Sequence, residues 1–289
     1  MDLLNIKNEL INKGYVIIPN ILTEDEIKNI KSLHDTWRES IPNHDKIHNI
    51  IDPHGIYKHH EAGHQRHAWL IRTNPKVQHV FKYLWNCDKL TTGFDGSCYI
   101  NKETTKPDKL WTHTDQAPNK EGLVCYQSFV SLTSNKERTL VIYEGTHKLH
   151  KEYFKSKGIN NSKNWQLIDE THINIIQPLK RTLDVPAGSL VLWDSRCFHQ
   201  NQYGKPNSEE RIVQYICMLP DNNKLNSNSM KAKRLKYFEE RRTTSHWPYP
   251  INVNGKQPQT YGNAELLIDY TKLIIPEIDD LKDDIVKLL

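Results

Sequence analysis

The sequence contains no apolar run near the ~18 residues that a membrane-spanning helix needs, and its mean hydropathy is −0.72. We therefore expect no membrane as a partner. Glycine is scarce, at 12 of 289 residues, and proline is near its usual share, at 14, which excludes a collagen-like or low-complexity chain. The first residues lack the apolar stretch of a secretory signal, which favours a cytoplasmic location.

Cysteine is also scarce, and none of the five cysteines forms a C-x-x-C pair. Their odd number and irregular spacing suggest neither a disulfide framework nor a zinc ribbon, and they agree with a reducing compartment. The charge is nearly balanced, with 39 basic and 35 acidic residues. The concentrated basic field of a nucleic-acid-binding protein is missing, so we expect no nucleic-acid partner. The oligomeric state stays open.

Histidine and the large aromatic residues are abundant, with 15 His, 13 Tyr and 7 Trp. Neutral imidazole is the commonest metal ligand in proteins. The histidines therefore have to be divided into metal ligands and ordinary polar residues before a function can be inferred.

Apolar residues at helical spacing predict helices near both ends of the chain and in its middle. The expected helices are residues 3–13, 24–39, 76–85, 147–157, 230–242 and a packed tail at 278–288. Gly14 ends the first helix, and Thr23 with Glu26 forms a capping box that starts the second. Residues 42–66 are polar and are expected to be a loop.

Short runs rich in β-branched and aromatic residues predict strands. The expected strands are residues 15–18, 96–100, 123–132, 140–143, 171–176, 189–193 and 211–219. Many short strands separated by turn residues indicate a sandwich or jelly roll. We expect one domain over residues 1–289, with an N-terminal extension (1–90), a strand-rich core (91–220) and a C-terminal helical extension (221–289).

One local motif suggests a zinc site. His60-Glu-Ala-Gly-His64 fits H-E-x-x-H, which on a helix would place two imidazoles one turn apart with Glu61 as general base. Its flanks are polar, and Gly63 weakens a helix interior by ~1 kcal/mol. A zinc metalloprotease is therefore a distant alternative, and a His-rich loop is the favoured interpretation.

A second constellation is spread over the strand-rich region. His113 and Asp115 form an H-x-D pair, His199 follows the strand at 189–193, and Arg211 opens the next strand. Two imidazoles and one carboxylate are the facial triad of non-haem Fe(II) oxygenases, and the planar fork of arginine suits the carboxylate of a keto acid. The combination indicates an Fe(II) site more strongly than H-x-D alone.

The chain resembles the phytanoyl-CoA dioxygenase-like branch of Fe(II)/2-oxoglutarate oxygenases over most of its length. The segments that carry the resemblance are residues 14–19, 113–116, 139–148 and 188–199. The chain is most similar to an uncharacterised fungal-type subgroup, through the patterns Gly63-His64, Trp69, Arg72, Phe94-Asp-Gly96 and Thr244-Ser-His-Trp-Pro248. Glu144 departs from the usual proline of the family, in a segment that holds no ligand.

The resemblance implies an α+β protein with a double-stranded β-helix, or jelly-roll, core and terminal helices packed outside. It implies that His113, Asp115 and His199 bind Fe(II) and that Arg211 holds the far carboxylate of 2-oxoglutarate, with Gln127 lining the co-substrate pocket. Fe(II), 2-oxoglutarate and O₂ would then serve hydroxylation or oxidative demethylation of a small molecule. Related halogenases carry a small residue in place of Asp115, which disfavours halogenation.

Polar and aromatic residues in the subgroup-like segments are candidate substrate contacts: Trp69, Arg72, Asp95, His147, Arg196, His246 and Trp247. Gln116, Asn201 and Gln202 are candidates to orient the metal ligands. Trp111 and Trp193 are expected in the core. A non-catalytic jelly-roll binding protein, which would keep the fold and bind no metal, is the alternative function.

Overall fold

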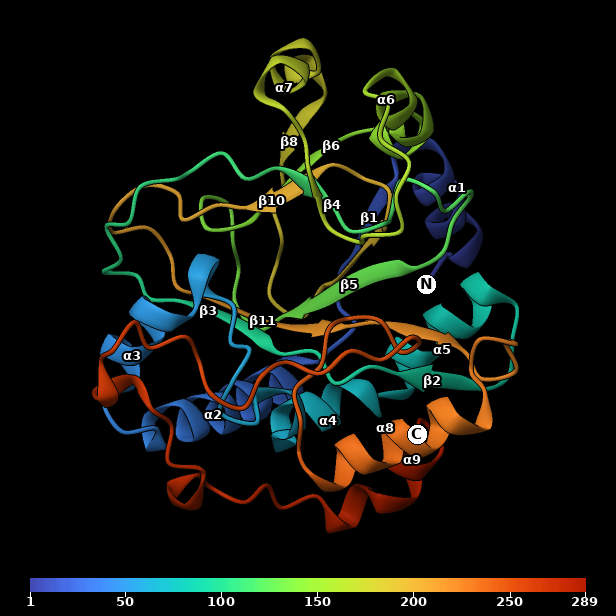
Figure 1. Ribbon diagram of the computed structural model, residues 1–289. Coiled ribbons are helices and arrows are strands. Elements are labelled where there is room, and N and C mark those ends of the chain that lie inside the picture. Colours follow the sequence, from blue (N-terminus) through green and yellow to red (C-terminus); the bar gives the residue numbers. More distant parts are fainter. The chain divides into compact units, whose positions relative to one another are not determined.

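The computed structural model describes residues 1–289 and combines helices with antiparallel sheets, which confirms the predicted α+β class (Figure 1). None of its helices has the length and apolar character that crossing a membrane requires. The chain divides into two compact units, residues 1–19 with 100–211 and residues 20–99 with 212–289. The single domain over residues 1–289 stays a prediction.

The first unit is built on two antiparallel sheets. One contains β1 (Tyr15–Ile18), β9 (Leu190–Asp194) and β5 (Tyr126–Ser131), in that order. The other has the order β7 (Gln166–Leu167), β4 (His113–Thr114), β10 (His199–Asn201), β6 (Leu140–Tyr143) and β8 (Lys180–Thr182). Its helices are α1 (Leu3–Lys13), α6 (His150–Ser156) and α7 (Glu170–Ile175).

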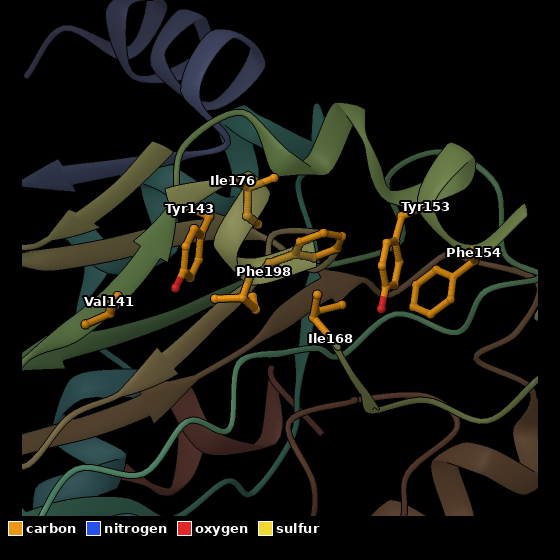
Figure 2. Close-up of a cluster of buried hydrophobic side chains, with 8 residues drawn as sticks. Val141, Tyr143, Tyr153, Phe154, Ile168, Ile176 and Phe198 are labelled. Atoms are coloured by element: carbon orange, nitrogen blue, oxygen red, sulfur yellow. The ribbon is translucent and has the colours of Figure 1, made fainter. Parts of the chain in front are cut away.

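A hydrophobic cluster holds the second of these sheets against its helices (Figure 2). Its buried members are Val141, Tyr143, Tyr153, Phe154, Ile168, Ile173, Ile176 and Phe198. Phe198 directly precedes His199, so its burial fixes the start of β10. Removal of such side chains from water is the main favourable contribution to folding.

Gly14 joins α1 to β1 and also positions the segment before His199. Its φ is 86°, in the left-handed region that glycine adopts without penalty. A Cβ atom here would lie 2.5 Å from Cys197 Sγ and 2.5 Å from His147 Nδ1. The Gly14 carbonyl accepts hydrogen bonds from the Asp194 backbone N–H at 2.9 Å and the Cys197 thiol at 3.2 Å. The turn therefore requires glycine.

The second unit contains most of the remaining helices and four strands. Two of these strands extend by one residue into the first unit: β3 ends on Ile100, and β11 begins on Arg211. The elements are α2 (Glu24–Ser40), α3 (His44–Ile51), α4 (Arg66–Arg72), α5 (Pro75–Trp85), β2 (Leu90–Thr92), β3 (Ser97–Ile100), β11 (Arg211–Ile216), β12 (Met218–Pro220), α8 (Asn228–Glu239) and α9 (Lys282–Val286). The predicted capping box is present at Thr23, whose side chain accepts from the Glu26 N–H.

Two secondary-structure predictions are wrong. Residues 42–66 were expected as loop but contain α3, where His48 is buried and bonded to Asp52 and to the Tyr99 carbonyl at 2.9 Å each. Residues 171–176 were expected as a strand but form α7. Asp169 caps this helix by accepting from the His172 N–H at 3.0 Å. Local capping and the burial of Ile173 outweigh the β-propensity of the segment.

The H-E-x-x-H segment is not an α-helix. His60 and Glu61 have φ values of 57° and 56°, and a short 3-10 turn over Ala62–His64 follows. The two imidazoles are therefore not presented one α-helical turn apart. Glu61 pairs with Arg241 at 2.7 Å, and His64 Nε2 bonds to the Arg242 carbonyl at 3.0 Å. The zinc-protease alternative is wrong.

Several histidines of the second unit are buried scaffold residues. His34, His64 and His67 are each 1% exposed or less. Burial disfavours the charged imidazole, so it lowers the pKa of all three, that of His64 to about 3. These side chains are neutral in the folded protein at neutral pH.

We expect acid to destabilise the fold through these histidines. In the unfolded chain they regain a pKa near 6.5, so below that pH the unfolded state binds more protons than the folded state. The free energy of unfolding should fall from pH 6.5 toward pH 3, by up to about 1.4 kcal/mol per pH unit for each histidine.

Urea unfolding between pH 4 and pH 7 measures this dependence. His64→Gln should make the fall in the free energy of unfolding less steep, by the contribution of one proton. Equal pH dependence in the wild type and His64→Gln would contradict the assignment.

Candidate metal centre

Strand pairing places two histidines side by side in the first unit. β10 lies between β4 and β6 (Figure 1) and pairs antiparallel with both. In the β10–β4 pair, His199 lies directly opposite His113. Side chains of directly opposite residues project from the same face of a sheet. The two ring centroids are 4.4 Å apart, and Asp115 follows β4 immediately.

The carboxylate of Asp115 lies between the two imidazoles. Its Oδ2 is 3.5 Å from His113 Nε2 and 3.4 Å from His199 Nε2. The three ligand atoms all lie within 4.8 Å of one another, and all three residues are buried. The structure thus brings to one point the three residues that the sequence predicts as metal ligands.

Backbone carbonyls set the tautomer of both rings. His113 Nδ1 is 3.1 Å from the Trp111 oxygen, and His199 Nδ1 is 3.0 Å from the Cys197 oxygen. A carbonyl only accepts, so each Nδ1 carries the proton and each Nε2 keeps its lone pair toward Asp115. Burial and the neighbouring His113 lower the pKa of His199, which keeps this ring neutral and able to bind a metal.

Gln127 on β5 reaches the same carboxylate. Its Nε2 donates to Asp115 Oδ2 at 2.8 Å, while its Oε1 is buried without a hydrogen-bond partner. Because the Gln127 amide is uncharged, it can hold the Asp115 carboxylate in place without neutralising the negative charge that would attract a cation. That Gln127 lines a co-substrate pocket stays a prediction.

Arg211 is a buried cation without an acidic partner in the protein. It is 1% exposed, its Nη1 donates to Asn201 Oδ1 at 3.0 Å, and its Cζ lies 5.3 Å from the Phe129 ring centroid. Its Nη2 is buried and lacks a hydrogen-bond partner. An uncompensated buried charge is costly, so this guanidinium is suited to an anionic ligand.

The predicted orienting residues make the following contacts, and a role in orienting the metal ligands stays a prediction. Asn201 Oδ1 accepts a hydrogen bond from Arg211 Nη1 at 3.0 Å. The Gln116 amide donates to the carbonyls of Lys120 and Gly122 at 2.9 and 2.8 Å, and Gln202 donates to the Glu137 carbonyl at 2.7 Å.

Three tryptophans surround the histidine pair. Trp193 is buried, as expected, with its ring centroid 5.3 Å from that of His199. Trp111 was expected in the core, but it is only half-buried, and it stacks on His113 with centroids 4.8 Å apart. Trp165, at 5.6 Å from His113, was not predicted, since it stands alone in a polar segment and belongs to no motif.

Two predicted substrate contacts lie in the first unit and are engaged within it. His147 Nε2 bonds to the Ile11 carbonyl at 3.0 Å. Arg196 pairs with Asp194 through two hydrogen bonds, at 2.9 and 2.6 Å. Their role in substrate binding stays a prediction.

The other predicted substrate contacts lie in the second unit. Trp69 belongs to a buried cluster with Phe94. Arg72 is buried and donates to the Gly63 and Asp95 carbonyls at 2.6 and 2.7 Å. Trp247 is buried, with its ring 4.8 Å from that of His246. A substrate role for these residues is likewise still a prediction.

The donor set determines what this centre can do. Two neutral imidazoles and one carboxylate on one side of an ion suit Fe(II) and leave further coordination positions open. The residues therefore fit a non-haem iron, and the unpaired Arg211 fits an acidic co-ligand such as 2-oxoglutarate.

Metal binding should depend on His199 and not on His60. After anaerobic loading with Fe(II) and desalting, the wild type and His60→Ala should retain about one iron per chain, whereas His199→Ala should retain little, because one of three ligands is lost. Iron analysis measures this, with circular dichroism to show that each variant is folded. Iron retained by His199→Ala and lost from His60→Ala would contradict the assignment.

The chain matches one protein family. The family model described as "Phytanoyl-CoA dioxygenase (PhyH)" matches residues 11–203. A curated relative, "Ava biosynthesis cluster protein O" of Aspergillus versicolor, is 29% identical over 204 residues, which is 65% of this chain and 65% of that protein. The chain thus spans less than two thirds of the relative's length.

Solved structures share the fold. GlcNAc Inducible Gene 2 from Candida albicans matches with a TM-score of 0.61 and 13% identity, over 76% of this chain and 64% of that one. EctD from S. alaskensis, solved with 2-oxoglutarate and 5-hydroxyectoine, matches with a TM-score of 0.53 and 13% identity, over 75% and 76%.

These likenesses confirm the jelly-roll fold, and the cofactor prediction agrees with the family and with the donor set. Because the family model covers well over half of the chain, the protein belongs to the phytanoyl-CoA dioxygenase family.

Proposed function

We propose that the chain is an Fe(II)- and 2-oxoglutarate-dependent oxygenase that hydroxylates, or oxidatively demethylates, a small molecule. The observation that carries the proposal is the convergence of His113 Nε2, His199 Nε2 and Asp115 Oδ2 within 4.8 Å of one another. Backbone carbonyls accept from Nδ1 of both rings, so both Nε2 atoms keep a lone pair for a metal. A buried carboxylate between two imidazoles is best satisfied by a cation.

The three residues of this triad would hold Fe(II). When bound with 2-oxoglutarate and O₂, the iron supplies the oxidation of a substrate C–H bond, and the protein supplies binding and orientation. Gln127 keeps the carboxylate of Asp115 oriented through its 2.8 Å hydrogen bond. Since Asp115 occupies the third ligand position, it leaves no room there for a halide, which favours oxygenation over halogenation.

Arg211 would bind the far carboxylate of 2-oxoglutarate. Its Nη1 is held by Asn201, and its Nη2 has no partner, so one edge of the guanidinium is free for a carboxylate oxygen. The Phe129 ring beside it excludes water on one side and strengthens such a pair.

A small-molecule substrate agrees with what the relatives act on or bind. The curated relative belongs to a biosynthesis cluster, and EctD was solved with 5-hydroxyectoine. HygX from Streptomyces hygroscopicus, with a TM-score of 0.51 and 11% identity, was solved with nickel, 2-oxoglutarate and hygromycin B. The five cysteines are free thiols, which agrees with a cytoplasmic location as part of this proposal.

Release of succinate from 2-oxoglutarate tests the proposal. The wild type with Fe(II), O₂ and ascorbate should release succinate, even slowly without substrate. Arg211→Gln should raise the KM for 2-oxoglutarate about 100-fold or more, because a charge-assisted hydrogen bond and its ion pair are lost. Arg181→Gln, at a partly exposed arginine that pairs with Glu144, should leave the KM unchanged.

Iron content provides the control for folding. Arg211→Gln should retain its iron, since Arg211 is not a ligand. Arg211→Lys keeps the positive charge but loses the planar guanidinium. Its KM for 2-oxoglutarate should lie between those of the wild type and Arg211→Gln. A folded, iron-loaded wild type that releases no succinate would contradict the proposed function and favour a non-catalytic binding protein.

A further inference from the structure

Two large apolar side chains are exposed beside the candidate metal centre. Trp165 is 42% exposed and Leu167 is 55% exposed. They lie in the segment that leads into and forms β7, the strand that pairs with β4. Exposed apolar surface that is contiguous with a polar site is typical of ligand-binding surfaces.

Strand register places this apolar surface on the same face as the metal ligands. Leu167 lies directly opposite His113 across the β4–β7 pair, so the two side chains project from the same face. The Trp165 ring reaches that face too, with its centroid 5.6 Å from that of His113 and the planes at 34°.

Trp111 supports the histidine from the segment that precedes β4. Its ring stacks on His113 at 4.8 Å and 23°, and its indole N–H donates to the Asn201 carbonyl at 2.9 Å. Trp111 is therefore held by β10, whereas Trp165 offers its indole surface to solvent.

The backbone holds Trp165 in an unfavourable conformation. Its φ of 65° lies in the left-handed region, which costs a bulky residue roughly 1–2 kcal/mol. Hydrogen bonds on both sides keep it there: Asn164 Oδ1 accepts from the Ala117 N–H at 3.2 Å, and Gln166 Nε2 donates to the Lys163 carbonyl at 2.8 Å. Such outliers persist where the surrounding structure fixes them, and they are concentrated at functional sites.

We propose that Trp165 and Leu167 form an apolar wall of the substrate site and that the substrate presents a flat hydrocarbon face, an aromatic or fused carbocyclic ring, to this wall. The inference rests on the proposed function for the meaning of the metal centre. The indole face provides stacking, and the aliphatic Leu167 extends the same surface without a π face. A cation would lose hydration against Leu167 and gain nothing from it, so the wall favours an uncharged ring.

Binding of two small probes tests the wall without turnover. We would titrate 2-naphthol, as the flat apolar probe, and choline, as a cationic probe, into the protein by calorimetry. Each titration is done on the metal-free chain and on the chain loaded with Mn(II) and 2-oxoglutarate. The wall is part of the folded protein, so 2-naphthol should bind in both states and more tightly than choline.

Trp165→Ala should weaken 2-naphthol binding about tenfold, because the stacking surface is lost. Trp165→Phe should stay within about threefold of the wild type, since a flat ring remains. Tyr261→Ala removes an aromatic side chain that is 85% exposed elsewhere, and it should not change the affinity. Thermal melting checks that each variant is folded.

Three results would overturn the inference: no binding of 2-naphthol to the wild type, equal 2-naphthol affinity in Trp165→Ala, or tighter binding of choline than of 2-naphthol. Failure of the proposed function has a different signature. In that case 2-oxoglutarate would not bind the Mn(II)-loaded chain, while the 2-naphthol titrations of the metal-free chain would still decide whether the wall exists.

Discussion

The pairing of β10 with β4 is the constraint on which the candidate site depends. With His199 opposite His113, two imidazoles meet on one face of a sheet, and a shift of one residue would send one of them to the other face. Burial of Phe198 and the tight turn at Gly14 hold this register from outside the site. The carbonyls that fix both Nδ1 atoms then direct two lone pairs toward Asp115. A metal-binding arrangement therefore follows from ordinary strand geometry.

The second determinant is the unpaired charge of Arg211. Most cations of this chain are exposed or paired with a carboxylate, as Arg196 is with Asp194. Arg211 is buried, bonded only to the neutral side chain of Asn201, and covered by Phe129. A buried guanidinium of this kind is stabilised when an anion pairs with it. An acidic co-substrate could pair with Arg211 and also bind at the open positions of an iron held by three protein ligands.

Much of this could be predicted from sequence, for physical reasons that differ between residues. The turn at Gly14, the capping box at Thr23 and the H-x-D pair are local signals, so they can be recognised without a structure. Tertiary context decided the rest. Residues 171–176 look like a strand but form a helix because Asp169 caps them and because Ile173 and Ile176 fit the core. The hydrogen bond of Asn201 with Arg211 joins strands of two different sheets, and the Trp165 ring lies beside a histidine 52 positions earlier in the chain, so neither contact can be read from local sequence signals.

The most direct test of the account is the anaerobic optical spectrum of the protein with Fe(II) and 2-oxoglutarate. Chelation of the iron by the keto acid gives a visible charge-transfer band that neither component gives alone, and it requires the ligand set and the co-substrate at one centre. The account predicts that this band appears in the wild type at one equivalent of each component and is absent from His113→Ala. A folded wild type without the band, or a His113→Ala variant that keeps it, would contradict the assignment of the centre.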